Sequence, residues 1–166
     1  MEQYDRFEGR SLAVRGKRLH LGWTRWSNGS GFETSYLVVH EGDEHGRFSY
    51  EGRFDDDDFQ GAYRELERRY YAGEGAAFAE AGEAQTEWLV ALNSATATAV
   101  SSRTWLSALL WVSPACCVDR IEREAVGNDG EPYAWTRLSV VEFRNSQMTS
   151  EREFDIDDEE RASVES

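Results

Sequence analysis

The chain has 166 residues, of which 32 are acidic and 18 basic, so its formal net charge is −14. A field of that sign repels phosphate backbones and anionic lipid, which excludes nucleic acids and membrane surfaces as expected partners. The six Trp, seven Tyr and eight Phe favour a folded protein, either one domain or two tightly associated repeats.

The first elements expected along the chain are strands. Leu19, Leu21 and Trp23 alternate with polar or small residues, which is typical of a half-buried strand. Two further strands are expected over residues 32–41 and 47–54. Short glycine-containing connections join the three, so the pattern predicts a three-stranded antiparallel meander.

The periodicity then changes to that of a helix. Residues 59–72 place Phe, Ala, Tyr and Leu side chains on one face, and Gly73 follows as a C-terminal breaker. A second helix is expected over residues 76–93. The small polar run 94–102 is interpreted as a linker, and the tail after Glu160 as loose chain that could extend a short helix.

The last third of the chain repeats the first. An apolar run, 105–112, is expected to be a strand, and a second meander follows over residues 117–154. The alignment matches Val38-Val39 with Val140-Val141 and Phe54-Asp55 with Phe154-Asp155. Such a period indicates one structural unit used twice. We therefore expect an α+β protein with a first part at 1–74 and a second at 75–166, packed as one compact unit.

The cysteines and the basic residues give information on where in the cell the protein is located. Cys116 and Cys117 are adjacent, a spacing at which a disulfide is strained, so two buried or half-buried free thiols are expected. No apolar run is long enough to span a membrane, and the N-terminus does not resemble a signal peptide. The sequence thus predicts a cytoplasmic protein. Seventeen of the 18 basic residues are Arg, which either a GC-rich genome or a salt-adapted cytoplasm would explain.

Acidic runs at 55–58 and 155–160 occupy the same place in both copies. Clustered carboxylates could bind Mg²⁺ or Ca²⁺. Helix capping is favoured instead, because each run lies at a junction between a strand and a helix and side-chain oxygens there satisfy free backbone N–H groups. No metal site and no cofactor are predicted.

The strings FDDDDFQGAYRELERRYYAGEG, EPYAWTRLSVVEFR and FDIDDEE resemble the nuclear transport factor 2-like (SnoaL-like) superfamily. More specifically, they are similar to tandem modules at the C-terminal ends of large actinobacterial regulatory proteins, and the likeness covers most of the chain. It implies a cone whose concave sheet face forms a pocket, and sheets that dimerise face to face. By this likeness residues 1–74 look like the back half of a first module, a meander plus a helix, and residues 75–166 like a second module. The second module looks shortened, because its helix leads directly to the strand near Thr104. The region in which the family's enzymes carry their acidic base is thereby missing.

Pocket-lining candidates come from alternate residues of the central strands. One face carries Phe32, Thr34, Tyr36, Val38 and His40, and its counterpart carries Ala134, Thr136, Leu138, Val140 and Glu142. Apolar and singly polar positions of this kind line ligand pockets, although they also form plain cores. The residues expected to contact a ligand are Thr34, Tyr36, His40, Thr136 and Glu142.

Four functions remain open at this point. The favoured one is a non-catalytic module that binds a small apolar ligand or assembles through its sheet as a homodimer. For such an interface the suitable large apolar side chains are Trp23, Trp26, Trp105, Trp111 and Trp135. The second is a small isomerase, hydratase or cyclase, for which His20, His40 and Glu142 are the reasonable bases; no catalytic residue is committed. The last two are a purely structural role and a truncated remnant of a larger regulatory protein.

Overall fold

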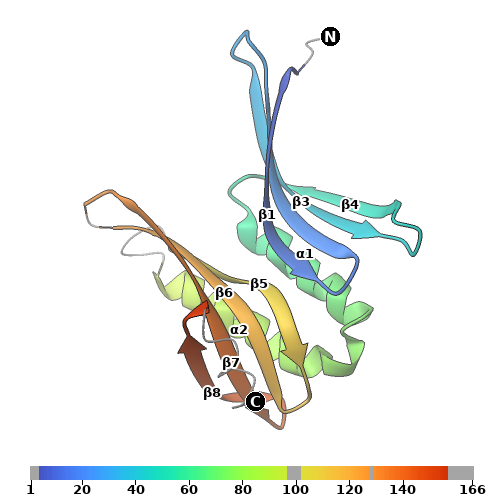
Figure 1. Cartoon of the computed structure of the whole chain (residues 1–166), viewed down its shortest axis with the longest axis vertical. Coiled ribbons are helices and arrows are strands. Elements are labelled where there is room, and N and C mark those ends of the chain that lie inside the picture. Colours follow the sequence, from blue (N-terminus) through green and yellow to red (C-terminus); the bar gives the residue numbers. More distant parts are fainter. Residues whose placement is uncertain (1–3, 97–101, 128, 157–166) are drawn as a thin grey trace. The chain divides into compact units, whose positions relative to one another are not determined.

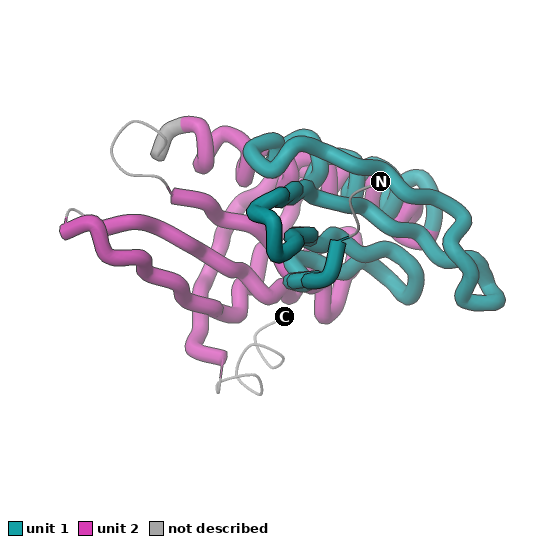
Figure 2. Tube along the Cα trace, turned by 90° about the horizontal axis from the view of Figure 1, so that it is seen from above, with its two compact units in different colours: residues 1–73 teal, residues 74–166 magenta. Residues whose placement is uncertain are grey.

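The computed structural model describes residues 4–96, 102–127 and 129–156. The chain divides into two compact units, residues 1–73 and 74–166 (Figure 2). The tail after Glu160 and most of the linker expected at 94–102 lie outside the described residues. Among the described residues, no helix is long and apolar enough to cross a membrane.

Unit 1 is a four-stranded antiparallel meander followed by one helix (Figure 1). Its elements are β1 (Arg6–Arg15), β2 (Leu19–Ser27), β3 (Glu33–Gly42), β4 (Phe48–Phe54) and α1 (Phe59–Ala72). The expected three-stranded meander is therefore one strand short. The missed strand is β1, whose first six residues are exposed on both faces and so show no apolar alternation.

Helix α1 begins where the sequence predicts. The Asp58 carboxylate accepts a hydrogen bond from the Gly61 backbone N–H at 3.0 Å, which caps the helix, and Gly73 ends it. The capping interpretation is thus confirmed for the first acidic run. The helix contacts all four strands through its buried face, formed by Phe59, Ala62, Tyr63, Leu66 and Tyr70. Arg69 identifies the sheet face that α1 covers, because it pairs with Glu41 of β3 at 2.6 Å and lies over the Tyr50 ring of β4.

Unit 2 has the reverse order, with its helical part before the sheet. Its elements are η1 (Ala76–Phe78), α2 (Ala79–Thr96), β5 (Ser102–Val112), β6 (Cys116–Val126), β7 (Pro132–Arg144) and β8 (Gln147–Phe154). The expected helix over 76–93 is thus a 3₁₀ turn followed by an α-helix, and residues 94–96, assigned to a linker, belong to that helix. The predicted strand at 105–112 is confirmed within β5.

Both faces of the unit 2 sheet are apolar at the centre. On one face Ala81 of α2 packs in a cluster of buried residues, which also contains Cys117, Val141 and Phe143. On the other face lies a second cluster, formed by Cys116, Val118, Leu138 and Val140, with Phe154 against it. The adjacent thiols therefore point to opposite faces. Both are free and buried, as predicted.

Strand pairing gives a correspondence between the two sheets. Leu37 is paired with Phe54 in unit 1, and Leu138 with Phe154 in unit 2, and a register shift follows Glu41 and Glu142 alike. By these pairs Val39 corresponds to Val140. The sequence alignment, which matched Val39 with Val141, is therefore one residue off, because the repeated Val-Val letters fit at either register.

The two helices cover non-corresponding faces of their sheets. Helix α1 covers the face that carries Leu21, since Leu21, Leu19 and the α1-bonded Arg15 lie on one side. Leu21 is paired with Val39 in β3, and Val39 corresponds to Val140 in unit 2. Because Val140 is paired with Val118, Val118 is the residue of unit 2 that corresponds to Leu21. Helix α2 instead packs on the Cys117 side. Among the described residues, each sheet consequently has one face that the helix of its own unit does not cover, here called its helix-free face, and these are opposite faces of the same pattern.

Candidate ligand-binding site

An open pocket lies on the helix-free face of the unit 1 sheet. Its volume is about 450 Å³, within the range of small-molecule sites. Five residues line it, namely Tyr4, Trp26, Thr34, Tyr36 and Arg53. They come from the chain just before β1 and from β2, β3 and β4, so the sheet itself forms the floor.

Aromatic side chains surround this pocket. The Phe7 and Trp26 ring centroids are 4.7 Å apart, and Tyr4 lies 6.1 Å from Trp26 and 5.6 Å from Phe32. Phe7 and Phe32 remain 57% and 46% exposed although they make these contacts. Half-exposed aromatic rings that already hold one another in place offer apolar area to a ligand at little cost in side-chain entropy.

A polar row crosses the same face. His20, His40 and Glu51 are direct cross-strand partners on β2, β3 and β4. The His40 Nε2 and Glu51 Oε2 atoms are 3.3 Å apart, and Glu51 accepts a hydrogen bond from Arg53 Nε at 2.7 Å. The Arg53 hydrogen bond, ahead of His40, lowers the pKa of Glu51. Arg53 thus joins the polar row to the pocket, and its guanidinium carbon lies 4.9 Å from the Tyr36 ring centroid.

The predicted ligand contacts are divided between the two sheets. Thr34 and Tyr36 line the pocket. His40 is on the same face but pairs with Glu51 and stacks on Phe48, outside the lining. Thr136 donates to Glu122 at 2.6 Å and Glu142 pairs with Arg152 at 3.2 Å, both on the helix-free face of unit 2. Three of the five predicted residues thus belong to unit 1 and two to unit 2, and within unit 1 the pocket lining contains two of the three.

Sequence analysis missed Tyr4 and Arg53 as lining residues, and considered Trp26 only as an interface aromatic. A usable signal existed for Arg53, because strand alternation places it on the face opposite Phe54. In the ladder Arg53 is paired with Val38, two residues from Tyr36 on β3. The pairing, which is not visible in the letters, was needed to bring the two together.

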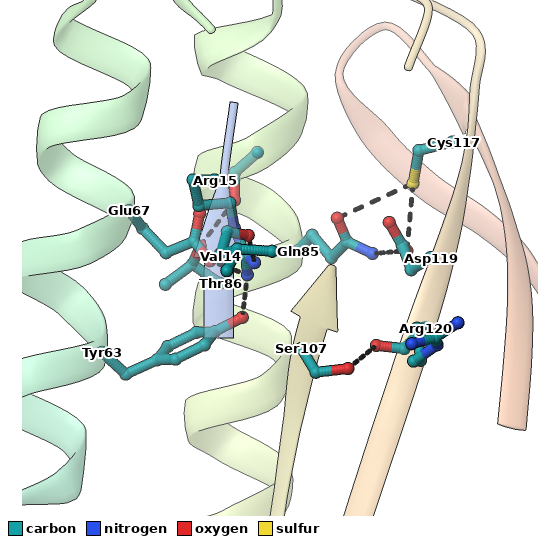
Figure 3. Close-up of polar contacts among 11 residues, drawn as sticks. Val14, Arg15, Tyr63, Glu67, Gln85, Thr86, Ser107, Cys117, Asp119 and Arg120 are labelled. Carbon is teal, nitrogen blue, oxygen red and sulfur yellow. Dashed lines mark hydrogen bonds and ion pairs between the residues drawn. The ribbon is translucent and has the colours of Figure 1, made fainter. Parts of the chain in front are cut away.

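A buried polar cluster in unit 2 was also missed. Asp119 is fully buried, and its Oδ2 accepts from Gln85 Nε2 at 2.5 Å and lies 3.3 Å from the Cys117 sulfur (Figure 3). Burial, followed by the charge of Asp119, raises the pKa of the Cys117 thiol. A protonated thiol is a poor nucleophile. The hydrogen bond between Gln85 and Asp119 connects α2 to β6.

Unit 1 contains a second buried cluster. Arg15 of β1 donates from Nε to Glu67 Oε1 at 2.9 Å and from Nη2 to the Tyr63 hydroxyl at 2.8 Å (Figure 3). Burial by itself lowers the pKa of Arg15, but Glu67, together with Tyr63 and Tyr71, outweighs this effect and the pKa is raised. Arg15 therefore stays charged and ties the edge strand β1 to α1.

The acidic run 55–58 is used for structure. Asp56 accepts hydrogen bonds from the Trp23 indole at 2.6 Å and from the Ser35 hydroxyl at 2.7 Å, while Asp58 caps α1. Within the described parts of the chain, no group of three or more His, Cys, Asp or Glu side chains could hold a metal ion. Most of the second run, 157–160, lies outside the described residues.

No known protein family, curated protein or solved structure matches the chain. The function of the candidate site is therefore inferred from its geometry.

Proposed function

We propose that this protein is a non-catalytic binding module, and that the pocket on the helix-free face of unit 1 holds a small apolar ligand. The observation that carries the proposal is the lining itself, which combines three aromatic side chains, two of them tyrosines, with one threonine hydroxyl and one guanidinium in about 450 Å³. Mostly apolar walls with a few placed polar groups are what small-molecule sites have in common.

Binding is favoured over catalysis because the lining lacks the commonest proton acceptors of enzymes. A general base must come within hydrogen-bond reach of its substrate, and among the five lining residues none is a histidine or a carboxylate. The nearest such groups along the row, His40 and Glu51, are paired with each other. A small isomerase, hydratase or cyclase that uses His40 remains the alternative, and loss of turnover in His40→Gln with ligand affinity kept would favour it.

The proposal also takes residues 1–74 as the back half of one SnoaL-like module and residues 75–166 as a second, shortened module. This assignment is supported by the matching register shifts after Glu41 and Glu142 and by the sequence segments FDDDDFQGAYRELERRYYAGEG, EPYAWTRLSVVEFR and FDIDDEE. The buried free thiols support a cytoplasmic, reducing location.

Binding can be tested with a neutral planar probe, 2-naphthalenemethanol, titrated into the ¹⁵N-labelled full chain. We expect amide shifts to concentrate at residues 24–36 and 53. Tyr36→Ala should weaken binding about tenfold or more, since it removes a ring from the apolar wall.

Trp135→Ala is the matched control, because Trp135 is also a half-exposed ring stacked with an arginine but belongs to unit 2. Its affinity should equal that of the unaltered chain. Shifts spread evenly over both sheets, or equal affinity in Tyr36→Ala, would contradict the proposal.

Assembly through the same face is the second candidate. The specific observation is the exposure of Phe7 and Phe32 in an otherwise highly charged chain. A homodimer would then form over this sheet face, and light scattering at increasing protein concentration should show it. Phe7→Ser should return the chain to monomers, and a monomer at every concentration would exclude this candidate.

A further inference from the structure

The electrostatics of the unit 1 pocket indicate the charge of its ligand. Arg53 carries the one formal charge in the lining, and its side chain is 63% exposed. Among the described residues its hydrogen bond to Glu51 uses Nε alone. An arginine has five N–H donors, so the two terminal amino groups are available to a ligand.

The aromatic side chains of the lining do not make a cationic ligand the favoured one. The face of an aromatic ring attracts positive charge, and a pocket lined by rings could in principle hold an ammonium group. Here the Arg53 guanidinium already lies over Tyr36, 4.9 Å from its centroid. A second cation would be repelled by Arg53 at short range, whereas a carboxylate would be attracted to it.

The field of the whole chain limits the charge of such an anion. The net charge of −14 opposes negative ligands at long range, but salt screens exposed charges over about 8 Å at physiological ionic strength. The contact with Arg53 acts at hydrogen-bond distance and is screened less. A single carboxylate satisfies both conditions better than a dianion, because a bidentate pair with arginine needs one carboxylate only.

Resting on the proposed binding function, we infer that the pocket takes a planar aromatic monocarboxylate. Its ring packs among Trp26, Tyr4 and Tyr36, and its carboxylate accepts two hydrogen bonds from the terminal amino groups of Arg53. Thr34 lies in the same lining and supplies a hydroxyl for a further polar substituent.

Three probes that differ in one substituent test this inference by calorimetric titration of the full chain at pH 7. They are 2-naphthoate, 2-naphthalenemethanol and the protonated 2-naphthylmethylamine. We expect 2-naphthoate to bind about tenfold or more tightly than the alcohol, as a charge-assisted hydrogen bond predicts, and the amine to bind most weakly.

Arg53→Gln should bring naphthoate and the alcohol to similar affinities and leave the alcohol little changed. Arg25→Gln is the matched control. It removes the same charge from an ion-paired arginine of the same sheet, on the face opposite its neighbour Trp26. The preference for naphthoate should survive in that variant.

The possible outcomes distinguish failure of the inferred ligand charge from failure of the proposed binding function. Equal or better binding of the alcohol or the amine, still lost in Tyr36→Ala, overturns the charge assignment and leaves the binding function standing. A preference for naphthoate that Arg25→Gln removes as well as Arg53→Gln overturns the role of Arg53. Failure of all three probes to bind contradicts the proposed function together with the inference.

Discussion

Leu12 of β1 and Leu110 of β5 occupy the same place in their sheets, each as the extra residue of a β-bulge. The pairing skips from Ser11 to Ala13 in unit 1 and from Leu109 to Trp111 in unit 2. The following residues, Ala13 and Trp111, face Leu21 and Val118, which correspond to each other. Bulges re-aim a strand and are kept as designed features, so the shared position argues for two sheets built to one plan.

The two leucines differ in burial, which gives a matched pair of variants. Leu12 is 4% exposed and Leu110 is 42% exposed. Leu12→Ala should lower the free energy of unfolding by about 2–5 kcal/mol, because it leaves a cavity in the core of unit 1. Leu110→Ala should cost less than about 1 kcal/mol. Urea denaturation of both variants measures this, and equal costs would show that the bulge itself, not burial, determines the loss.

Removal of Glu67 should be among the most damaging polar changes in unit 1. Glu67→Ala leaves the Arg15 guanidinium buried without its carboxylate, at an expected cost of about 3–5 kcal/mol in the free energy of unfolding. Arg68→Ala breaks the exposed pair with Glu65 and should cost less than about 1 kcal/mol. Similar denaturation midpoints for the two variants would contradict a buried, structural role for the pair.

The two thiols should be unreactive while the protein is folded. Burial raises the pKa of both Cys116 and Cys117, so little thiolate is present near neutral pH. We expect iodoacetamide at pH 8 to modify neither residue on the time scale that labels both in denaturant, with intact mass as the measurement. Rapid labelling of Cys117 in the native state would show that the Gln85–Asp119 cluster opens.

Stability should fall as the pH is lowered through the range in which histidine titrates. Burial, with the neighbouring His40 as a smaller cause, lowers the pKa of His20 in the folded chain below 6.5. The unfolded state then binds a proton first as the pH falls. The contribution of His20 is therefore fully present above pH 6.5 and is lost as the pH falls through the folded pKa.

Two measurements check this dependence. The NMR titration of the His20 ring should have its midpoint below 6.5, and His20→Asn should flatten the decline of the free energy of unfolding between pH 7 and 5. A midpoint above 6.5 would mean that the ring is stabilised in its charged form, against the burial seen here.

The sequence predicts those elements whose signal is local. The cap at Asp58, the apolar stripe of α1 and the strand ending in Val112 each follow from neighbouring letters. β1 could not be found in this way, because Arg6–Ser11 has both faces exposed and is held by pairing with β2.

The candidate site was half predictable for a related reason. Strand alternation placed Thr34 and Tyr36 on one face, and both line the pocket. Arg53 reaches that pocket through the ladder between β3 and β4, and Tyr4 reaches it from the chain before β1. Contacts between distant segments depend on register, and a shift of one residue moves a whole strand's side chains to the other face.

The helices on non-corresponding faces limit how results can be carried from one half of the molecule to the other. Val39 and Val140 occupy corresponding positions in the strand pairing of their sheets. The first nevertheless lies beneath α1, while the second lies on the face that α2 does not cover. The helix cover of a residue should therefore be checked before a stabilising substitution is transferred between the halves, because the residue with corresponding strand partners is not the one beneath a helix. Val39, Val140 and Val141 are all buried, so the choice of counterpart decides which neighbours a side chain packs against and not whether it is buried.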